Sequence, residues 1–465
     1  MKRESEFRYT KLAGILREQI LSGYIKPGQF LMSENELCRH YAMSRTSVRK
    51  SLEELLKEGL IVKKVGQGTI VSPDLAIEPS NKKVLRILAT SPSHFMDSCM
   101  PFIIEEFEKQ NPHVEVKCLS FPTSDFWESI RSSSQIGLQA DIVFAGDRQF
   151  SEMEEAGPFL DLREPFKDVL PEIYPDLRKT FESGMQMPAI PVTFSPVYLV
   201  YNPKLFHKHD IPLPKHDWTK EDFLRAAQRL TIDTDGDGII DQYGLTLSCS
   251  LNRWPLLALQ NGVDFTGSID REGLVKTLTF IHDLLYRYRI ATLSPRYLIN
   301  SEAFIRQKAG MVLTTSIELA GWRKETLPFE PMVASMPFGE RKASLLIANA
   351  MMIPAASEEE ELAIRFLKTA LDPAIQERIS REHKFLSVLQ PVNDAVYSPT
   401  ELTPLNIEGS RIVNSHFLHE LFTDFSVMEE IEAEMELFWS GLESAVHFAD
   451  RMVTMIESRL TPSSQ

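Results

Sequence analysis

The sequence has few cysteines and no long apolar run. Four cysteines occur in 465 residues, and no two of them form a CxxC pair. This argues against a disulfide scaffold or a zinc ribbon and predicts reduced thiols. No stretch reaches about 18 uninterrupted apolar residues, so no membrane-spanning helix is predicted. The N-terminal MKRESEFRYTKL lacks the apolar core of a signal peptide, so we expect a cytoplasmic protein without membrane contact.

Positive charge is also scarce, except near the N-terminus. The chain has 50 Lys and Arg against 65 Asp and Glu, a formal net charge of −15. Residues 1–73, called the head below, hold 13 basic and 8 acidic residues, whereas the rest holds 37 and 57. The head thus has a net charge of +5 and the remainder a net charge of −20. This asymmetry is expected when a nucleic-acid-binding module is joined to another module.

Three helices and a hairpin are predicted in the head. Apolar residues recur at helical spacing from Tyr9 to about Leu21. SENE at 33–36 is a capping box for a second helix, and Ser44 caps a third helix that ends at Gly59. LIVKKV and TIVS, joined by a GQG turn, predict the two strands of a wing.

The second and third predicted helices form a helix-turn-helix. In that arrangement the N-terminal residues of the second helix of the pair face base edges in the major groove. Arg45 and Arg49 lie one turn apart there, and an arginine can donate to guanine O6 and N7 together. Ser47 and the first-turn N–H groups can bind phosphate, as can Lys63 and Lys64 of the wing. Taken alone, these residues could also be a solvated helix face with ordinary surface charge.

The whole N-terminal string resembles the winged-helix DNA-binding domain of the GntR family of bacterial regulators. The resemblance rests on the motifs G-x-I-x-P-G (23–28), S-E-x-E-L (33–37), S-R-T-S-V-R (44–49), L-x-x-E-G-L-I (55–61) and G-Q-G-T-x-V (66–71). Met32 stands where the family usually has Pro, and Asn35 where it usually has an Arg that contacts DNA. The predicted DNA-binding residues, partly from the pattern and partly implied by the resemblance, are Ser33, Asn35, Ser44, Arg45, Thr46, Ser47, Arg49, Lys63, Lys64, Gln67 and Gly68.

Strands and helices alternate after a linker predicted at residues 74–83. Strands are predicted at 84–90, 114–119 and 140–146, and helices at 99–110 and 124–136. This alternation predicts an α/β body, residues 84–465, with a parallel sheet covered on both faces. Ligands of such sheets bind beyond the carboxyl ends of the strands, here near His94 and Asp147.

The body resembles bacterial extracellular solute-binding proteins of the maltose-binding-protein type over nearly all of residues 84–390. The resemblance rests on the segments FIIEEFEKQNPHVEV, VYLVYNPKLFHKHDIPLPKHDWTKEDFLRAAQRLT (197–231), AFIRQKAGMVLTT (303–315) and ELAIRFLKTALDPAIQERI (361–379). Ala140-Asp141 and Gln307-Lys308 replace the usual Pro-Asp and Gly-Lys. The family normally carries an export signal, so we expect its fold here without its transport role.

This resemblance implies a multidomain protein: a small α+β winged-helix head followed by a two-lobed α/β domain of the periplasmic-binding-protein type 2. It implies an N-lobe at about 84–195 and 346–389 and a C-lobe at about 196–345 and 390–465. The family largely binds sugars, oligosaccharides or related polar solutes, which need aromatic faces and paired polar side chains. The predicted ligand-binding residues are His94, Asp147, Arg253, Trp254, Glu318, Trp322, Arg323 and Asn349. Core packing for the tryptophans, and loop positions for His94 and Asn349, are the plainer alternatives.

A separate acidic loop, DTDGDGIIDQYG at 233–244, has the spacing of an EF-hand calcium loop. Aspartates stand at relative positions 1, 3, 5 and 9, glycine at 6, and the bidentate Glu of position 12 is replaced by Gly244. We predict a structural calcium site made by Asp233, Asp235, Asp237, the Ile239 carbonyl and Asp241, completed by another carboxylate. The alternative is an Asx-turn loop with solvated carboxylates, and no cofactor is expected to be required.

Together these features predict a ligand-responsive bacterial transcription regulator. Its heads would bind a pseudo-palindromic double-stranded DNA operator as a homodimer, and its body a small-molecule effector, a carbohydrate. No enzyme activity is expected, because GxSxG, HExxH and P-loop motifs are absent from the sequence. One alternative is a head fused to a pyridoxal-phosphate aminotransferase-like domain, although no segment offers a convincing Schiff-base lysine. Another is a cytoplasmic solute-binding protein without a regulatory role.

Overall fold

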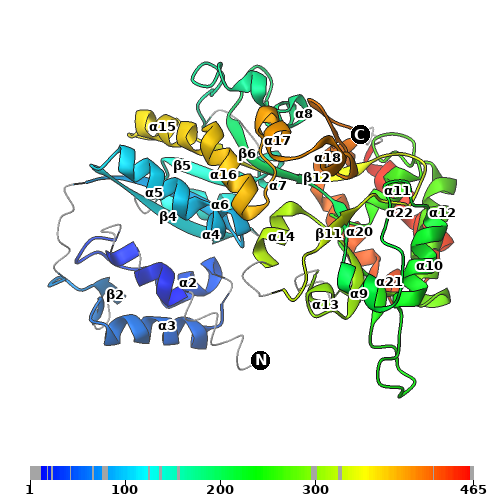
Figure 1. The fold of residues 1–465 in the computed structure, drawn as a ribbon. Coiled ribbons are helices and arrows are strands. Elements are labelled where there is room, and N and C mark those ends of the chain that lie inside the picture. The colour runs from blue at the N-terminus through cyan, green and yellow to red at the C-terminus, as the bar shows by residue number, and fades with distance from the viewer. Residues whose placement is uncertain are drawn as a thin grey trace. The chain divides into compact units, whose positions relative to one another are not determined.

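The computed structural model describes residues 12–460 except for 18, 22–24, 42, 65–67, 76–81, 124–125, 136–138, 154–157, 295–300, 323–326 and 423 (Figure 1). The chain divides into two compact units. The first comprises Met1–Ser93, Ile104–Phe144 and Met352–Phe366, and the second His94–Ile103, Ala145–Met351 and Leu367–Gln465. The domain and lobe boundaries drawn from the sequence stay predictions.

The head, in the first unit, is a winged helix as predicted. Helices α2 (Glu34–His40) and α3 (Arg45–Lys57) are followed by antiparallel strands β1 (Ile61–Lys64) and β2 (Gly68–Val71). Residues 12–17 and 19–21 are also helical. Val48, Leu52 and Leu55 of α3 are buried in one apolar cluster with residues from the other elements of the head.

Local signals explain where the helices of the head begin and end. The Ser33 N–H donates to Glu36 Oε2 at 2.7 Å, and the Glu36 N–H donates back to Ser33 Oγ at 3.3 Å, the capping box that the sequence predicts. Ser44 Oγ accepts from the Ser47 N–H at 3.2 Å and caps α3. Gly59 follows α3 with φ of +73°, a backbone conformation that glycine adopts without strain.

Elsewhere in the first unit a parallel sheet forms. Strand β3 (Lys83–Ser91) pairs with β4 (Val114–Pro122) on one side and with β5 (Ile142–Gly146) on the other, both in parallel. Helices α5 (Met100–Gln110) and α15 (Glu360–Ala370) pack through Phe107 and Phe366, whose ring centroids are 5.1 Å apart. The predicted alternation of strands and helices is therefore confirmed. The predicted helix at 99–110 begins one residue later, after the short α4 (His94–Ser98).

The second unit contains a five-stranded mixed sheet in the order β11, β7, β10, β8, β9. Strands β8, β9 and β10 run parallel, whereas β7 is antiparallel to both β10 and β11. Strand β12 pairs with β6 and, in parallel, with β15. These strands are β6 (Ala189–Pro196), β7 (Tyr198–Tyr201), β8 (Tyr243–Ser248), β9 (Ala291–Ser294), β10 (Ala309–Thr314), β11 (Met332–Ala334), β12 (Ser344–Met352) and β15 (Ser415–Phe417).

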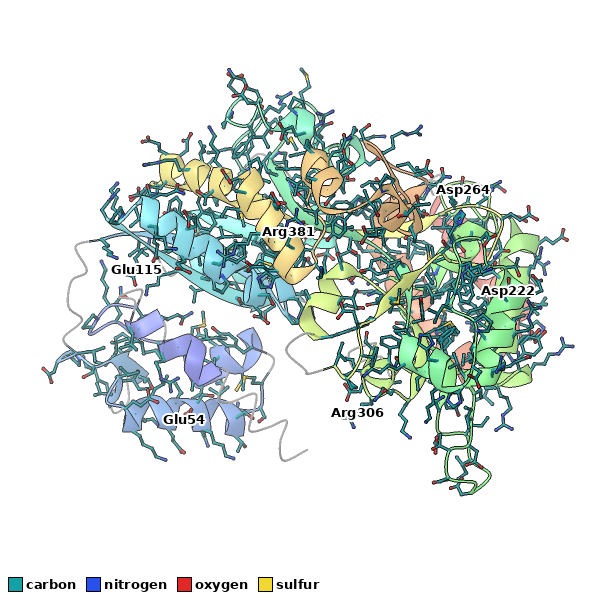
Figure 2. The ribbon with its side chains drawn as sticks, in the orientation of Figure 1. Glu54, Glu115, Asp222, Asp264, Arg306 and Arg381 are labelled. Carbon is teal, nitrogen blue, oxygen red and sulfur yellow. The ribbon has the colours of Figure 1, made fainter. Side chains whose placement is uncertain are left out.

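Helices surround these strands, and a large apolar cluster fills the space between them. Thr219 and Asp222 form a capping box at the start of α10, and Asp222 is labelled in Figure 2. Within the described part of the chain, no helix combines the length and apolar character needed to cross a membrane. The principal remaining elements are α6 (Phe126–Gln135), α7 (Asp147–Ser151), α8 (Pro175–Thr180), α9 (Pro203–Lys208), α10 (Lys220–Leu230), α11 (Pro255–Gln260), α12 (Arg271–His282), the π-helical η2 (Asp283–Arg287), α13 (Glu302–Ile305), α14 (Ser316–Trp322), α16 (Pro373–His383), α17 (Gln390–Val396), α18 (Pro399–Leu402), α19 (Leu418–Leu421), α20 (Phe425–Glu434), α21 (Glu436–Trp439) and α22 (Ala445–Leu460).

Candidate functional site

The N-terminal turn of α3 presents the predicted DNA-binding side chains. Arg45, Thr46 and Arg49 are exposed, while Val48 and Leu52 are buried in the head. Burial of the apolar stripe therefore leaves the two arginines on the solvent side of the helix. The hydroxyls of Ser44 and Ser47 lie 3.0 Å apart, so both take part in the capping of α3.

Arg49 has a partner that the sequence does not reveal. Its Nε donates to Glu34 Oε2 of α2 at 2.8 Å, and this hydrogen bond raises the pKa of Arg49. The two residues are 15 positions apart, so no helical spacing connects them. The bond to Nε leaves the Nη1 and Nη2 amino groups without a protein acceptor among the described residues, which suits a two-pronged contact with a base.

The other predicted DNA-binding residues of the head that the structure describes are exposed, and one of them also caps a helix. Lys63, Lys64 and Gly68 of the wing are exposed, and Lys64 Nζ lies 5.9 Å from the centroid of the Phe30 ring. Ser33 and Asn35 are exposed on α2 or just before it, and Ser33 is engaged in the capping box. Gln67 lies outside the described residues.

In the second unit, the buried Arg253 forms an ion pair with the half-buried Glu318. Arg253 Nη2 donates to Glu318 Oε1 at 2.5 Å, and Arg253 is only 3% exposed. Arg253 Nη1 donates to the Asn252 carbonyl, and Glu318 Oε2 accepts from Thr314 Oγ1 at 2.6 Å. The pair joins the loop before α11 to helix α14, so these two residues lie together, and their contact with a ligand stays a prediction.

Both predicted tryptophans pack in the interior. Trp254 is 1% exposed at the start of α11, and Trp322 is 2% exposed at the end of α14, with its ring 5.6 Å from that of Phe304. Core packing is thus part of the role of each. Their contact with a ligand stays a prediction, and Arg323 lies outside the described residues.

Several buried polar atoms near these residues lack a partner. Among the described residues, no hydrogen-bond acceptor is found for Arg253 Nε, Trp254 Nε1 or Trp322 Nε1, and Ser316 Oγ of α14 is also unpaired. A buried polar group without a partner costs about 1–3 kcal/mol. A polar ligand or ordered water at these atoms would remove that cost.

His94 also contacts α14. Its imidazole lies directly against Gly321, where an added Cβ would overlap the ring. Helix α14 therefore gathers three of the predicted residues, since Glu318 and Trp322 belong to it and His94 packs on it. Any side chain larger than hydrogen at position 321 would displace His94.

Asp147 and Asn349 lie at neighbouring positions on α7 and β12. Asp147 Oδ1 accepts from the Ala348 N–H at 2.9 Å, and Asn349 Nδ2 lies 3.6 Å from where a Cβ on Gly146 would stand. Burial raises the pKa of Asp147 to about 7 and lowers the pKa of His419 to about 4. Asp147 Oδ2 is 3.9 Å from His419 Nδ1, so His419 belongs to this group although the sequence gives no sign of it.

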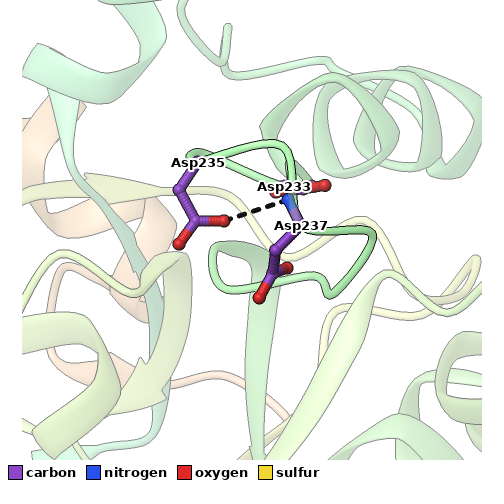
Figure 3. A group of neighbouring side chains, drawn as sticks. All are labelled: Asp233, Asp235 and Asp237. Carbon is purple, nitrogen blue, oxygen red and sulfur yellow. Dashed lines mark hydrogen bonds between the residues drawn. The ribbon is translucent and has the colours of Figure 1, made fainter.

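The acidic loop between α10 and β8 brings three carboxylates together. Ligand atoms of Asp233, Asp235 and Asp237 lie within 4.8 Å of one another (Figure 3). The backbone supports this shape, because Asp233 accepts from the Gly236 and Gly238 N–H groups, which lowers the pKa of its carboxyl. Asp241 instead accepts from Thr234 Oγ1 and lies 3.8 Å from Lys308 Nζ.

Two models of known protein families match two different parts of the chain. The model of the gntR family of bacterial regulatory proteins matches residues 8–71. The model of the bacterial extracellular solute-binding protein family matches residues 95–377. The second match overturns the alternative of an aminotransferase-like body, because it assigns that segment to a different fold.

The curated relatives align with about a quarter of this chain or less. The arabinose metabolism transcriptional repressor of Geobacillus stearothermophilus is 32% identical over 109 residues, which are 23% of this chain and 29% of that protein. The histidine utilization repressor of Klebsiella aerogenes is 31% identical over 119 residues, 24% of this chain and 46% of that protein. The chain thus spans less than half the length of each of these relatives.

Solved structures match the body. An ABC substrate-binding protein from Listeria monocytogenes in complex with cycloalternan has a TM-score of 0.67 at 18% identity, covering 82% of this chain and 99% of that one. A solute-binding protein from Thermotoga lettingae bound with alpha-D-tagatose has a TM-score of 0.69 at 16% identity, covering 82% and 100%. At such identities the likeness shows the fold alone. The chain belongs to the bacterial extracellular solute-binding protein family, and its N-terminal part is a winged-helix domain of the gntR family of bacterial regulatory proteins.

Proposed function

We propose that this chain is a carbohydrate-responsive transcription regulator that acts on DNA in the cytoplasm. The observation that carries the proposal is the union, in one chain, of a gntR-type head with a body of the solute-binding family. The head would bind a pseudo-palindromic operator as a dimer through the N-terminal turn of α3 and the wing. The body would bind the effector and change the affinity of the heads for DNA.

The buried polar atoms around Arg253 and α14 support a carbohydrate as the effector. Two indole N–H groups and the Arg253 Nε are donors, and sugar hydroxyls can accept from all three. The names of the structural neighbours include cycloalternan and tagatose, which are carbohydrates. A site that combines tryptophans with a charged pair is suited to a polar ligand with apolar ring faces.

Regulation requires that the ligand distinguish two states of the protein. A ligand that binds both states equally shifts nothing, however tightly it binds. A tenfold change in operator affinity needs about 1.4 kcal/mol of coupling between ligand and DNA. This is a small fraction of typical binding energies, so a modest difference in ligand contacts is sufficient.

A thermal-shift screen of sugars and oligosaccharides against the full chain tests the ligand part of the proposal. A ligand at a hundred times its Kd stabilises the protein by about 2.7 kcal/mol. Trp322→Phe removes Nε1 but keeps an aromatic ring, so we expect it to diminish this stabilisation. Trp439→Phe is the matched control, because its Nε1 is also buried without a partner among the described residues. Equal shifts in both variants would contradict a ligand contact at Trp322.

A separate measurement decides between regulation and plain solute binding. The operator affinity is measured with and without the stabilising sugar by a titration of labelled promoter DNA. We expect the sugar to change that affinity. If it stabilises the body but leaves operator affinity unchanged, the alternative of a solute-binding protein without a regulatory role is favoured.

We also propose that the acidic loop at 233–244 holds calcium as a structural ion. Calcium at about a hundred times its Kd is expected to stabilise the chain by about 2.7 kcal/mol, seen as a higher unfolding midpoint. Asp235→Asn combined with Asp237→Asn removes two ligand charges and should abolish the shift. Asp168→Asn, at an exposed position outside the loop, should leave it intact. An unfolding midpoint that does not respond to calcium in the wild type is the contrary result.

A further inference from the structure

A cavity of about 540 Å³ lies in the second unit. Three segments that are distant in the sequence line it: the end of α11 with the loop that follows, the residues just before β12, and β15 with the residues on either side. Pockets for small molecules typically measure about 300–1,000 Å³, so a ligand of monosaccharide size fits. None of the described residues that line it belongs to the group predicted to bind carbohydrate. Its polar side chains are those of Asp264, Thr266, Arg341, Lys342, Asn414 and His416.

Hydrogen bonds to the backbone hold the walls of the cavity in place. Gln260 of α11 is 2% exposed, and its Nε2 donates to the Ala343 carbonyl at 3.3 Å. The Gln260 carbonyl accepts from the Arg341 N–H at 3.1 Å, so the segment before β12 is fastened to α11 at two points. The Ser344 N–H donates to the Asn414 carbonyl at 3.2 Å, beside the parallel pairing of β12 with β15. All three lining segments are therefore tied to one another.

Arg341 brings an unpaired guanidinium to this cavity. Its Cζ, Nε and Nη2 atoms lie 3.1, 3.2 and 3.3 Å from where a Cβ on Gly262 would stand, so the guanidinium rests on the Gly262 backbone. Gly262 has φ of +86°, a conformation that favours glycine. Among the described residues, no carboxylate or carbonyl accepts a hydrogen bond from the Arg341 side chain. An arginine with free donors binds a carboxylate or a phosphate through two parallel hydrogen bonds.

Asp264, which is labelled in Figure 2, offers a free acceptor in the same cavity. Its Oδ1 accepts from Thr266 Oγ1 at 2.7 Å and from the Thr266 N–H at 2.8 Å. These two bonds, and to a lesser degree the nearby His416 imidazole, lower the pKa of Asp264, so its carboxyl is ionised at neutral pH. Its Oδ2 has no donor among the described residues. A ligand hydroxyl can donate to that oxygen.

The other side chains around the cavity add little net charge. Lys342 Nζ pairs with Glu408 Oε1 at 3.2 Å, so the two charges offset each other. Val263 and Leu421 are buried and give the cavity an apolar wall. The cavity thus combines one free guanidinium, one free carboxylate oxygen and an apolar surface.

This combination matches a small organic anion that also carries hydroxyls. A neutral sugar would leave the Arg341 guanidinium without a charged partner, whereas inorganic phosphate would leave Asp264 Oδ2 without a hydroxyl donor. A sugar phosphate or a sugar acid satisfies both groups, and its ring carbons can pack on the apolar wall. We propose that the cavity is a second ligand site, which binds such a hydroxylated anion with the anionic group on Arg341 and a hydroxyl on Asp264. The inference goes beyond the proposed function, because it involves neither the head nor the residues around Arg253 and α14.

Isothermal titration calorimetry of the full chain without DNA tests the contact with Arg341. The anionic probes are glucose 6-phosphate, fructose 6-phosphate, gluconate and glucuronate, and neutral glucose is the comparison. We expect at least one of the anions to bind with a Kd that Arg341→Ala raises at least about tenfold. Arg341→Lys keeps the charge without the planar fork and should raise that Kd less. Any binding of glucose should not depend on Arg341.

Arg289→Ala is the matched control for Arg341→Ala. Arg289 is also exposed and lies in the same unit, but it is outside the cavity, so the Kd of the anion should stay at the wild-type value. Because Arg341 is exposed and unpaired, its replacement should not change the thermal unfolding midpoint measured without ligand. If none of the anions binds, or if Arg341→Ala leaves their binding unchanged, the proposal is wrong. Binding of sugar phosphates alone, or of sugar acids alone, supports it and identifies the anionic group.

Asp264→Asn tests the contact with a hydroxyl. The change keeps an acceptor for Thr266 and places an amino group where Oδ2 stood. It also removes a negative charge that repels every anion alike, so the informative quantity is a ratio of two Kd values. That ratio compares the bound anion with its analogue without hydroxyls, inorganic phosphate for a sugar phosphate or acetate for a sugar acid. We expect Asp264→Asn to reduce the preference for the hydroxylated anion, and an unchanged preference would contradict the contact with Asp264.

Discussion

Glu318→Ala is expected to lower the free energy of unfolding of the second unit by about 3–5 kcal/mol. The change leaves the Arg253 guanidinium buried at 3% exposure without its carboxylate. Only the Asn252 carbonyl would then accept from Arg253 among the described residues, because its Nε already has no acceptor. An uncompensated buried charge is among the most destabilising changes in a protein. Denaturant unfolding followed by tryptophan fluorescence measures it, with Trp254 adjacent to the pair.

Three variants separate this effect from a general response to mutation. Glu318→Gln keeps an acceptor for Arg253 and should cost less than Glu318→Ala. Arg253→Met with Glu318→Met removes both charges and should recover most of the loss. Arg381→Ala breaks the exposed pair of Arg381 and Glu377, for which we expect about 0–1 kcal/mol. A loss in Glu318→Ala as small as that in Arg381→Ala would show that Arg253 finds another partner.

Arg45→Ala is expected to weaken operator binding by about 1–3 kcal/mol, or about 5- to 150-fold, and to relax base preference at one position of each half-site. Arg45 is exposed at the first turn of α3, where its fork can reach a base edge, so the fold should not change. The measurement is a titration of operator variants at fixed salt. A footprint and base preference equal to those of the wild type would contradict the assigned role.

Lys64→Ala provides the contrast for Arg45→Ala. Lys64 is exposed on the wing, where its ammonium can meet phosphate but has no fork for a base. We expect Lys64→Ala to weaken binding by the same factor on all DNA sequences. It should also reduce by about one the slope of the logarithm of affinity against the logarithm of salt concentration. Lys57→Ala, in the last turn of the same helix α3, should change neither property. Arg45→Ala thus reports recognition of a base, and Lys64→Ala reports contact with a phosphate. Lys57→Ala reports the loss of a positive charge that contacts neither.

Much of the head is predictable because its signals are local. The capping box of Ser33 and Glu36, the Ser44 cap and the stop at Gly59 each act within a few residues. Helical spacing of Val48, Leu52 and Leu55 then decides which face of α3 is buried. Arg45 and Arg49 remain on the solvent side as a direct consequence.

The contacts that shape the candidate sites are not local. Glu34 and Arg49 are 15 residues apart, and Arg253 and Glu318 are 65 residues apart. Asp147 and Ala348 are separated by 201 residues, and the position of His419 beside Asp147 has no trace in the sequence pattern. The deep burial of Trp254 and Trp322 is likewise a result of packing that composition does not indicate.

The amino-acid sequence by itself determined a winged-helix head, an α/β body and the two families to which they belong. Caps, turns and apolar periodicity act over a few bonds, so they can be read along the chain. Only the tertiary structure decided which charges pair, which polar atoms are buried without a partner and which apolar side chains stay exposed. Those properties depend on how distant segments pack, because desolvation and hydrogen bonding act through space, not along the chain.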